Sequence, residues 1–82
     1  MKLEIYTPDQ TVFEGDINSV TVPGTAGAFE VLKDHAPIIS TLESGKVIVR
    51  TSDNQANTFH IKGGVVEVIQ NKVIVLADGL SE

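Results

Sequence analysis

The sequence predicts an all-β protein, a single small β-sandwich or flattened barrel of about nine or ten short strands. Valine and isoleucine dominate its apolar residues, and β-branched side chains favour the pleated, half-buried surface of a sheet. Apolar and polar residues alternate in several runs, among them residues 2–5, 19–22 and 59–62. This period of two is typical of strands, and no segment shows the 3.6-residue period of a helix.

Turn-forming residues separate the predicted strands. The first strand, residues 2–5, ends at a type I turn in which Pro8 takes the first central position, because the proline ring presets the backbone angle there. The next strand is broken or bulged at Gly15, and Pro23 with Gly24 ends the one that follows. The remaining predicted breaks are a turn at residues 43–45, hairpins at 53–55 and 70–72, and an interruption at Gly63 and Gly64.

The composition fits one small domain and argues against several classes of function. The chain has 82 residues, no cysteine and a formal net charge of −5, so it has no disulfide framework and no thiolate metal site. Its 6 Lys and Arg residues are scattered along the sequence, which argues against binding of nucleic acid and of anionic membranes. No run approaches the roughly 20 apolar residues of a membrane span, and the N-terminus does not resemble a signal peptide, so we expect no direct membrane insertion.

Residues that could support catalysis or metal binding do not converge in the sequence. His35 follows Asp34, a pair that could relay protons, but a metal site needs three or four ligands and the spacing offers no such set. The other interpretation is that the His35 ring fixes its own loop through hydrogen bonds. His60 alternates with polar residues, as a surface position on a strand does. An enzyme would need His35 to meet Glu30 or Asp34 in a cleft; no nucleophile elbow or phosphate loop is present, and we expect neither an enzyme nor a cofactor.

Some predicted strands are apolar on both faces. If Val73, Val75 and Ala77 face the core, then Ile74 and Leu76 face outward. Residues 38–39 and 65–66 pose the same question. Because an exposed apolar patch usually marks an interaction site, we expect a partner protein to cover this face.

Residues 22–37 are the least regular part of the chain. Pro23 and Gly24 stop one strand, Gly27 precedes a short strand that contains Phe29, and Pro37 keeps its neighbour out of helical geometry. The stretch has the character of a shaped surface rather than of a catalytic centre.

An ordered series of motifs runs through nearly the whole chain. Its first part consists of residues 3–5, 7–8, 12–15, 20–24, Gly27, Phe29, 31–32 and 35–37, and its second part of Leu42, Gly45, Val47, 63–64, 66–68, Asn71, Val73 and 75–78. In this order the motifs resemble the epsilon subunit of the bacterial rotary ATP synthase, which is called delta in mitochondria. The N-terminal domain of that family is a β-sandwich of this length, so the resemblance implies that residues 1–82 form one such domain.

The resemblance implies a non-catalytic subunit of the central rotor stalk, peripheral on the cytoplasmic face of the bacterial inner membrane. Such a subunit binds the gamma subunit along one face, rests on the ring of c subunits through its loops, and helps to couple proton flow to ATP synthesis in the catalytic head. The positions carried over as c-ring-facing are Gly24, Thr25, Gly27, Ala28, Glu30 and His35. Our own hypothesis adds Ile74, Leu76 and Ile39 of the apolar face as contacts for gamma.

The sequence departs from the family pattern in several places. Many members have Pro-Gly where this chain has Lys33 and Asp34, a glycine at the position of Glu30, and an acidic residue at the position of Ala28. Most bacterial relatives continue into a C-terminal helical hairpin that can inhibit ATP hydrolysis and, in some members, bind ATP. In this chain we expect no such hairpin and no nucleotide site. The alternative function is a generic β-sandwich adaptor for another protein, which would share the apolar face but has no reason to show the motif series.

Overall fold

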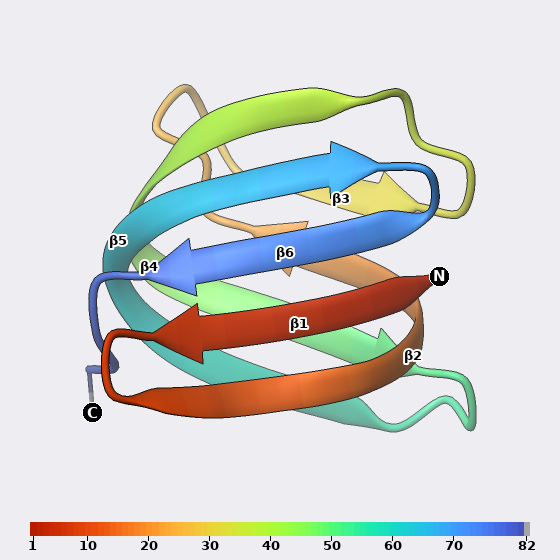
Figure 1. Ribbon diagram of the computed structural model, residues 1–82, viewed down its shortest axis with the longest axis horizontal. Helices are drawn as coiled ribbons and strands as arrows, with labels where there is room; N and C mark the ends of the chain where they lie inside the picture. Colours follow the sequence, from red (N-terminus) through yellow and green to blue (C-terminus); the bar gives the residue numbers. More distant parts are fainter. Residues whose placement is uncertain (82) are drawn as a thin grey trace.

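The computed structural model describes residues 1–81, which form six β-strands joined in one sheet (Figure 1). The strands are β1 (Lys2–Thr7), β2 (Gln10–Val22), β3 (Phe29–Leu32), β4 (Ile38–Thr51), β5 (Ala56–Ile69) and β6 (Lys72–Ala77). No helix occurs within these residues, and the all-β prediction is confirmed.

The sheet closes on itself into a barrel. The strands follow the order β1-β6-β5-β4-β2, and β2 returns to pair with β1, so that five strands form a ring. Strands β1 and β6 are parallel, and every other pair is antiparallel. Strand β3 lies outside the ring and pairs only with β2, so among residues 1–81 its second edge has no strand partner.

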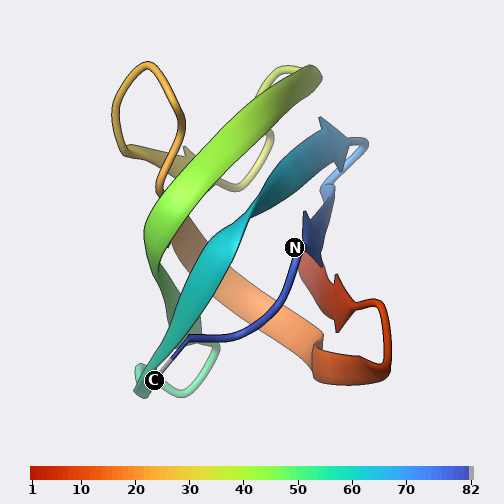
Figure 2. The ribbon, with the colours of Figure 1, turned by 90° about the vertical axis from the view of Figure 1, so that its left-hand side faces the viewer.

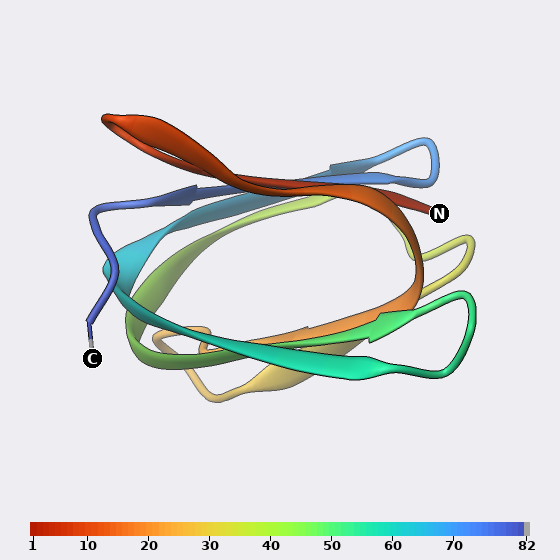
Figure 3. The same cartoon turned by 90° about the horizontal axis from the view of Figure 1, so that it is seen from below.

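The barrel is flattened into two layers because its three long strands bend. Figure 3 shows β2, β4 and β5 curving from one layer into the other. The buried positions change from even to odd residue numbers, or the reverse, at the bends. In β4, Leu42 is buried before the bend, and Val47 and Val49 are buried after it. In β5, Ile61 is buried before the bend and Val66 after it. Because side chains alternate with a period of two, each change requires an irregularity in the strand.

The prediction of nine or ten short strands is wrong, because glycines bend the strands instead of ending them. Gly63 and Gly64 lie inside β5 with φ angles of +110° and +151°. A Cβ atom on Gly64 would lie 2.1 Å from the carbonyl oxygen of Leu76. Only glycine permits this backbone conformation and this close approach. Strand β5 therefore continues through the predicted interruption, and β4 continues beside it through the predicted turn at residues 43–45.

The core lies between the two layers and is almost entirely aliphatic. Figure 2 looks down the longest axis and shows the strands surrounding this interior. The rings of Phe13 and Phe59 pack edge to face beside it, with centroids 6.0 Å apart. The buried apolar residues are Leu3, Ile5, Ile17, Val20, Val22, Val31, Leu42, Val47, Val49, Ile61, Val66, Val68, Val73, Val75 and Ala77.

Candidate functional site

One outer face of the barrel carries most of the exposed large apolar side chains. It spans β6, the C-terminal half of β5 and the N-terminal half of β4. Ile39 is 72% exposed and Leu76 is 54% exposed, whereas Val73 and Val75, which alternate with Ile74 and Leu76 along β6, are fully buried. We call this surface the Glu67 face; it consists of Ile39, Thr41, Val65, Glu67, Ile69, Lys72, Ile74 and Leu76.

The strand register places Glu67 at the centre of this face. Glu67 lies opposite Ile39 on β4 and opposite Ile74 on β6, and its neighbours along β5 are Val65 and Ile69. Directly opposed side chains in a sheet are about 5 Å apart, so Ile39 and Ile74 flank the Glu67 side chain, and Val65 and Ile69 lie on the same face two residues away along β5. The three residues predicted to contact gamma are therefore on one surface. Beside it is an open hollow of about 320 Å³, lined by Pro37, Ile38, Ile39, Glu67, Val68 and Ile69.

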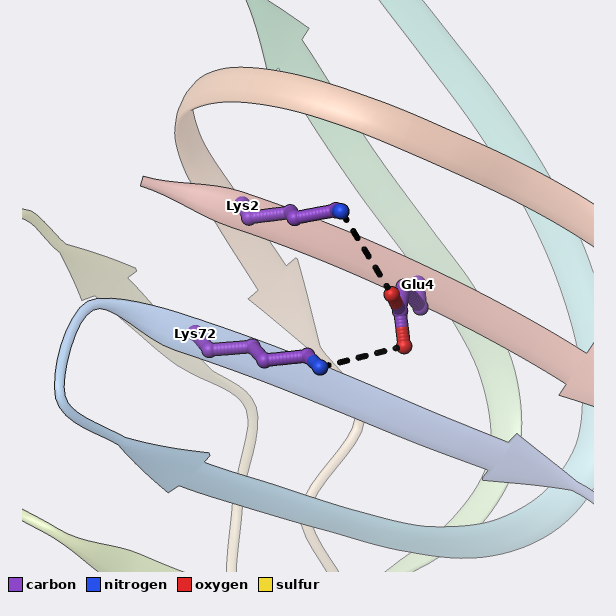
Figure 4. A network of polar contacts seen from close by, with 3 residues as sticks. All are labelled: Lys2, Glu4 and Lys72. Carbon is purple, nitrogen blue, oxygen red and sulfur yellow. Dashed lines mark ion pairs between the residues drawn. The ribbon is translucent and has the colours of Figure 1, made fainter.

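A second carboxylate, next to the Glu67 face, is buried between two lysines (Figure 4). Glu4 is 8% exposed, and its carboxylate oxygens lie 3.9 Å from Lys2 Nζ and 3.7 Å from Lys72 Nζ. The lysines are half exposed, so each pair stabilises the fold by about 1 kcal/mol or less, but without them a charge would be buried uncompensated. Desolvation, and then the Glu4 and Glu14 carboxylates, raise the pKa of the Tyr6 hydroxyl above its ordinary value.

The loop between β2 and β3 contains most of the predicted c-ring residues and is anchored on β4. The hydroxyl oxygens of Thr25 and Thr41 lie 2.8 Å apart, and the Thr25 amide donates to the Thr41 carbonyl oxygen at 3.1 Å. The Gly27 amide donates to the Gly24 carbonyl oxygen at 2.9 Å and closes a turn that leaves Ala28 exposed. A Cβ atom on Gly24 would lie 2.7 Å from the Gly27 carbonyl oxygen, so the turn requires glycine there.

The β3–β4 loop lies at the other end of β3 (Figure 1), and it contains His35. Its Nδ1 atom is 2.7 Å from the Ala36 carbonyl oxygen, in agreement with the interpretation that its ring fixes the loop. The Asp34 amide donates to Asn71 Oδ1 at 2.7 Å, and Asn71 Nδ2 donates to Asp34 Oδ1 at 2.9 Å. These two hydrogen bonds join the β3–β4 loop to the β5–β6 turn.

The six predicted c-ring residues do not form one cluster. They flank β3, with the loop of residues 24–28 at one end, the exposed Glu30 on the strand itself and His35 at the other end (Figure 1). Among residues 1–81, no three His, Asp or Glu side chains are placed to hold a metal ion. The arrangement offers a sheet edge and two shaped loops rather than a centre for proton transfer.

Basic side chains cluster on the outer face of the layer opposite the Glu67 face, and the sequence analysis did not predict this cluster. Lys46 and Arg50 alternate on β4 with buried valines, while His60 and Lys62 flank the buried Ile61 on β5. Lys46 lies directly opposite His60. The residues are scattered in sequence and become neighbours only through the β4–β5 register. Their alternation with apolar residues on two strands joined by a predicted hairpin was the pattern from which this basic cluster could have been predicted. His60 is a surface position, as predicted.

A second open hollow is lined mainly by the β1–β2 turn and by residues that follow β6. It measures about 570 Å³ beside the β1–β2 turn and is lined by Thr7, Pro8, Asp9, Gln10, Asp78, Gly79 and Leu80. The Thr7 hydroxyl there donates to Asp9 Oδ1 at 2.9 Å, an exposed contact between near neighbours in the chain that belongs to the β1–β2 turn. A closed barrel with one exposed apolar face and anchored loops is typical of a small domain that docks on other proteins.

The comparisons with known proteins give this docking domain a family. A family model described as "ATP synthase, Delta/Epsilon chain, beta-sandwich domain" matches residues 1–82, and the chain belongs to that family. The predicted resemblance is thereby confirmed, and with it the expectation of a subunit that is not catalytic by itself.

Relatives with high identity carry the name ATP synthase epsilon chain. The chain is 49% identical to that of Chlorobaculum tepidum over 96% of this chain and 90% of the relative. It is 44% identical to that of Chlorobium limicola over 98% of this chain and 91% of the relative. The epsilon chain of Sulfurimonas denitrificans is 43% identical, and the match spans 61% of that longer protein.

Solved structures share the fold. A chain of the Euglena gracilis mitochondrial ATP synthase, in a structure described as OSCP/F1/c-ring, superposes with a TM-score of 0.90 at 18% identity. A chain of the Tetrahymena thermophila mitochondrial ATP synthase, in a structure described as central stalk/c-ring, gives a TM-score of 0.82 at 18% identity. The matches cover 96% and 99% of this chain but only 51% and 65% of those chains.

Within residues 1–81 there is no helical segment with the length and hydropathy of a membrane span.

Proposed function

We propose that this chain is a rotor subunit of the central stalk of a proton-translocating ATP synthase, bound to gamma and seated on the c ring. In this function it couples proton flow to ATP synthesis without chemistry of its own. Its position is peripheral, at the cytoplasmic face of a bacterial inner membrane. Membership of the delta/epsilon family and the names of the relatives support the assignment to this complex.

The observation that carries the proposal is the exposed apolar surface of the Glu67 face. A small barrel that buries its valines efficiently still leaves Ile39 and Leu76 in water, beside Val65 and Ile69. Burial of apolar surface against a partner stabilises a complex by about 25 cal/mol per Å² before the costs of association. We therefore assign gamma to this face, with Ile74, Leu76 and Ile39 as contacts.

The c ring is assigned to the side of the barrel that carries β3. The residues inferred for this contact flank the strand at both ends, and the edge of β3 that has no strand partner among residues 1–81 lies between them. A flat ring surface can touch both loops at once only if it runs along this strand. This placement keeps Gly24, Thr25, Gly27, Ala28, Glu30 and His35 in a single contact.

Binding of gamma is tested with a matched pair of leucines. Leu76→Asp and Leu32→Asp make the same change at positions that are 54% and 53% exposed, one on the Glu67 face and the other on β3. Purified gamma from the same genome is titrated into each chain by calorimetry. Leu76→Asp is expected to weaken binding at least about 100-fold, because a carboxylate is desolvated where a leucine was buried; Leu32→Asp is expected to bind like wild type.

Other outcomes decide against the assignment. Equal affinity of the folded Leu76→Asp variant refutes the Glu67 face as the gamma contact. A wild-type chain that does not bind gamma, but is retained by another protein through this face, identifies the adaptor of the alternative hypothesis.

The c-ring contact is tested by cross-linking, which is simple because the chain has no cysteine. A single cysteine in place of Ala28 is expected to form cross-links to subunit c in the assembled enzyme. A cysteine in place of Thr58, exposed on the layer opposite the Glu67 face, serves as the control. Cross-links to subunit c from Thr58→Cys but not from Ala28→Cys contradict the proposed c-ring contact.

A further inference from the structure

Glu67 is an exposed carboxylate in an apolar setting. Its neighbours across the strands are Ile39 and Ile74, and along β5 they are Val65 and Ile69. Any partner that covers these exposed apolar side chains also covers the carboxylate between them. The charge of Glu67 must then lose most of its water.

The chain does not supply a compensating cation at this position. The ion pairs within residues 1–81 are those of Glu4, which engages both Lys2 and Lys72. Lys72 is diagonal to Glu67 on β6, but Figure 4 shows its ammonium group directed to Glu4 on the other neighbouring strand. If Lys72 turned to Glu67, the buried Glu4 would lose one of its two cations.

A buried charge left without a partner destabilises a complex strongly, whereas a well-placed opposite charge restores affinity and fixes the register of the two surfaces. We propose that gamma presents a lysine or arginine to Glu67, surrounded by apolar side chains that pack on Ile39 and Leu76. The inference rests on the proposed function and specifies the chemistry of the gamma surface. Glu67 is then the residue that selects the partner, while the apolar neighbours supply most of the buried area.

The same charge argues against a second copy of this chain on the face. A two-fold axis at the centre of the face would set Glu67 against Glu67 of the other copy, and like charges repel at such distances. The face is apolar enough to associate, but its central charge favours a cationic partner over self-association.

The experiment compares wild type and four variants in calorimetric titrations with gamma. Glu67→Gln keeps the size of the side chain and removes its charge, and it is expected to weaken binding at least about 30-fold, since truncation of one member of a buried charge pair costs 2–5 kcal/mol. Glu14→Gln removes an exposed carboxylate on β2, outside the Glu67 face, and is expected to change affinity less than about threefold. The remaining variants are Lys72→Gln and the double variant that combines Glu67→Gln with Lys72→Gln.

Each outcome is decisive. If wild type binds gamma and Glu67→Gln binds equally well or more tightly, gamma presents no cation there and the inference fails, although the proposed function stands. If Lys72→Gln costs as much as Glu67→Gln and the double variant costs no more, Lys72 is the cation and the inference also fails. If wild type does not bind gamma, the proposed function itself fails.

A charge reversal gives an independent readout. Glu67→Lys is expected to lose binding to wild-type gamma and to recover at least tenfold with one gamma variant in which a surface lysine or arginine is replaced by glutamate. Recovery with none of these gamma variants contradicts the inference.

Discussion

The bend in β5 should depend on one glycine, and replacing Gly64 with alanine tests this. The added Cβ atom would lie 2.1 Å from the Leu76 carbonyl oxygen and 2.9 Å from Ala77 Cα, both backbone atoms of β6. Neither is the end of a flexible side chain, so the strands must separate where Gly64 pairs with Ala77. The φ angle of +151° adds strain that an alanine cannot relieve in place.

Strain of about 1–3 kcal/mol and overpacking of about 1–3 kcal/mol give an expected loss of about 4 kcal/mol. A chain of 82 residues has a total stability of about 4–12 kcal/mol, so Gly64→Ala should leave about 0–8 kcal/mol and remove between a third and all of the stability. Urea denaturation followed by circular dichroism measures the difference directly.

Gly15→Ala provides the control for this substitution. Its Cβ atom would meet only the Phe13 ring at 3.6 Å, an ordinary contact, and its φ is not positive. We expect its free energy of unfolding to stay within about 1 kcal/mol of wild type. A Gly64→Ala variant as stable as Gly15→Ala would refute the argument that close approach and positive φ fix the bend.

Three further predictions concern polar contacts. Asn71→Ala should cost about 1–2 kcal/mol, because it breaks both hydrogen bonds with Asp34 and places alanine at a φ of +60°; a double-mutant cycle with Asp34→Ala should show coupling, and strict additivity would contradict it. A hydrogen bond from the Thr51 hydroxyl lowers the pKa of the Asp53 carboxyl in the folded state. The carboxylate therefore stabilises the fold above the ordinary pKa of aspartate, and this contribution is lost as the pH falls through the lowered pKa. The free energy of unfolding of Asp53→Asn, measured against pH, should lack this loss. Desolvation and the Glu4 charge raise the pKa of the Tyr6 hydroxyl in the folded state. The neutral hydroxyl therefore stabilises the fold fully below the ordinary tyrosine pKa, and this contribution is lost as the pH rises through the raised pKa. Ultraviolet titration should show that Tyr6 ionises above the ordinary range, and that Glu4→Gln shifts this ionisation downward.

Local patterns in the sequence predicted strands with a period of two but did not always settle which side of a strand is buried. Residues 73–77 are apolar at every position, and the structure selects the arrangement in which Val73 and Val75 are buried and Leu76 is exposed. The hairpin at residues 70–72 was also predictable, because asparagine tolerates positive φ and Gln70 and Asn71 both adopt it. These features depend on neighbouring residues only.

Features that depend on long-range register could not be predicted in the same way. Glycines in a strand signal either an end or a bend, and only the paired strand distinguishes them: β4 and β5 continue in step on both sides of the bend. The central position of Glu67 requires the register of β4, β5 and β6 together. The contact between Asp34 and Asn71 joins loops that are 37 residues apart, which no local pattern reveals.

The two proposed contacts are connected through β4. Thr41 belongs to the Glu67 face, and its hydroxyl and carbonyl oxygen hold Thr25 of the loop assigned to the c ring. The path between the two surfaces therefore runs through the hydrogen bonds of Thr41, which pairs with Val65 of β5 on one side and holds Thr25 on the other. In a rotor subunit, load from the ring would reach gamma through this path. Since a closed barrel can yield only by breaking ladder hydrogen bonds, its stiffness is the property that such a coupling element requires.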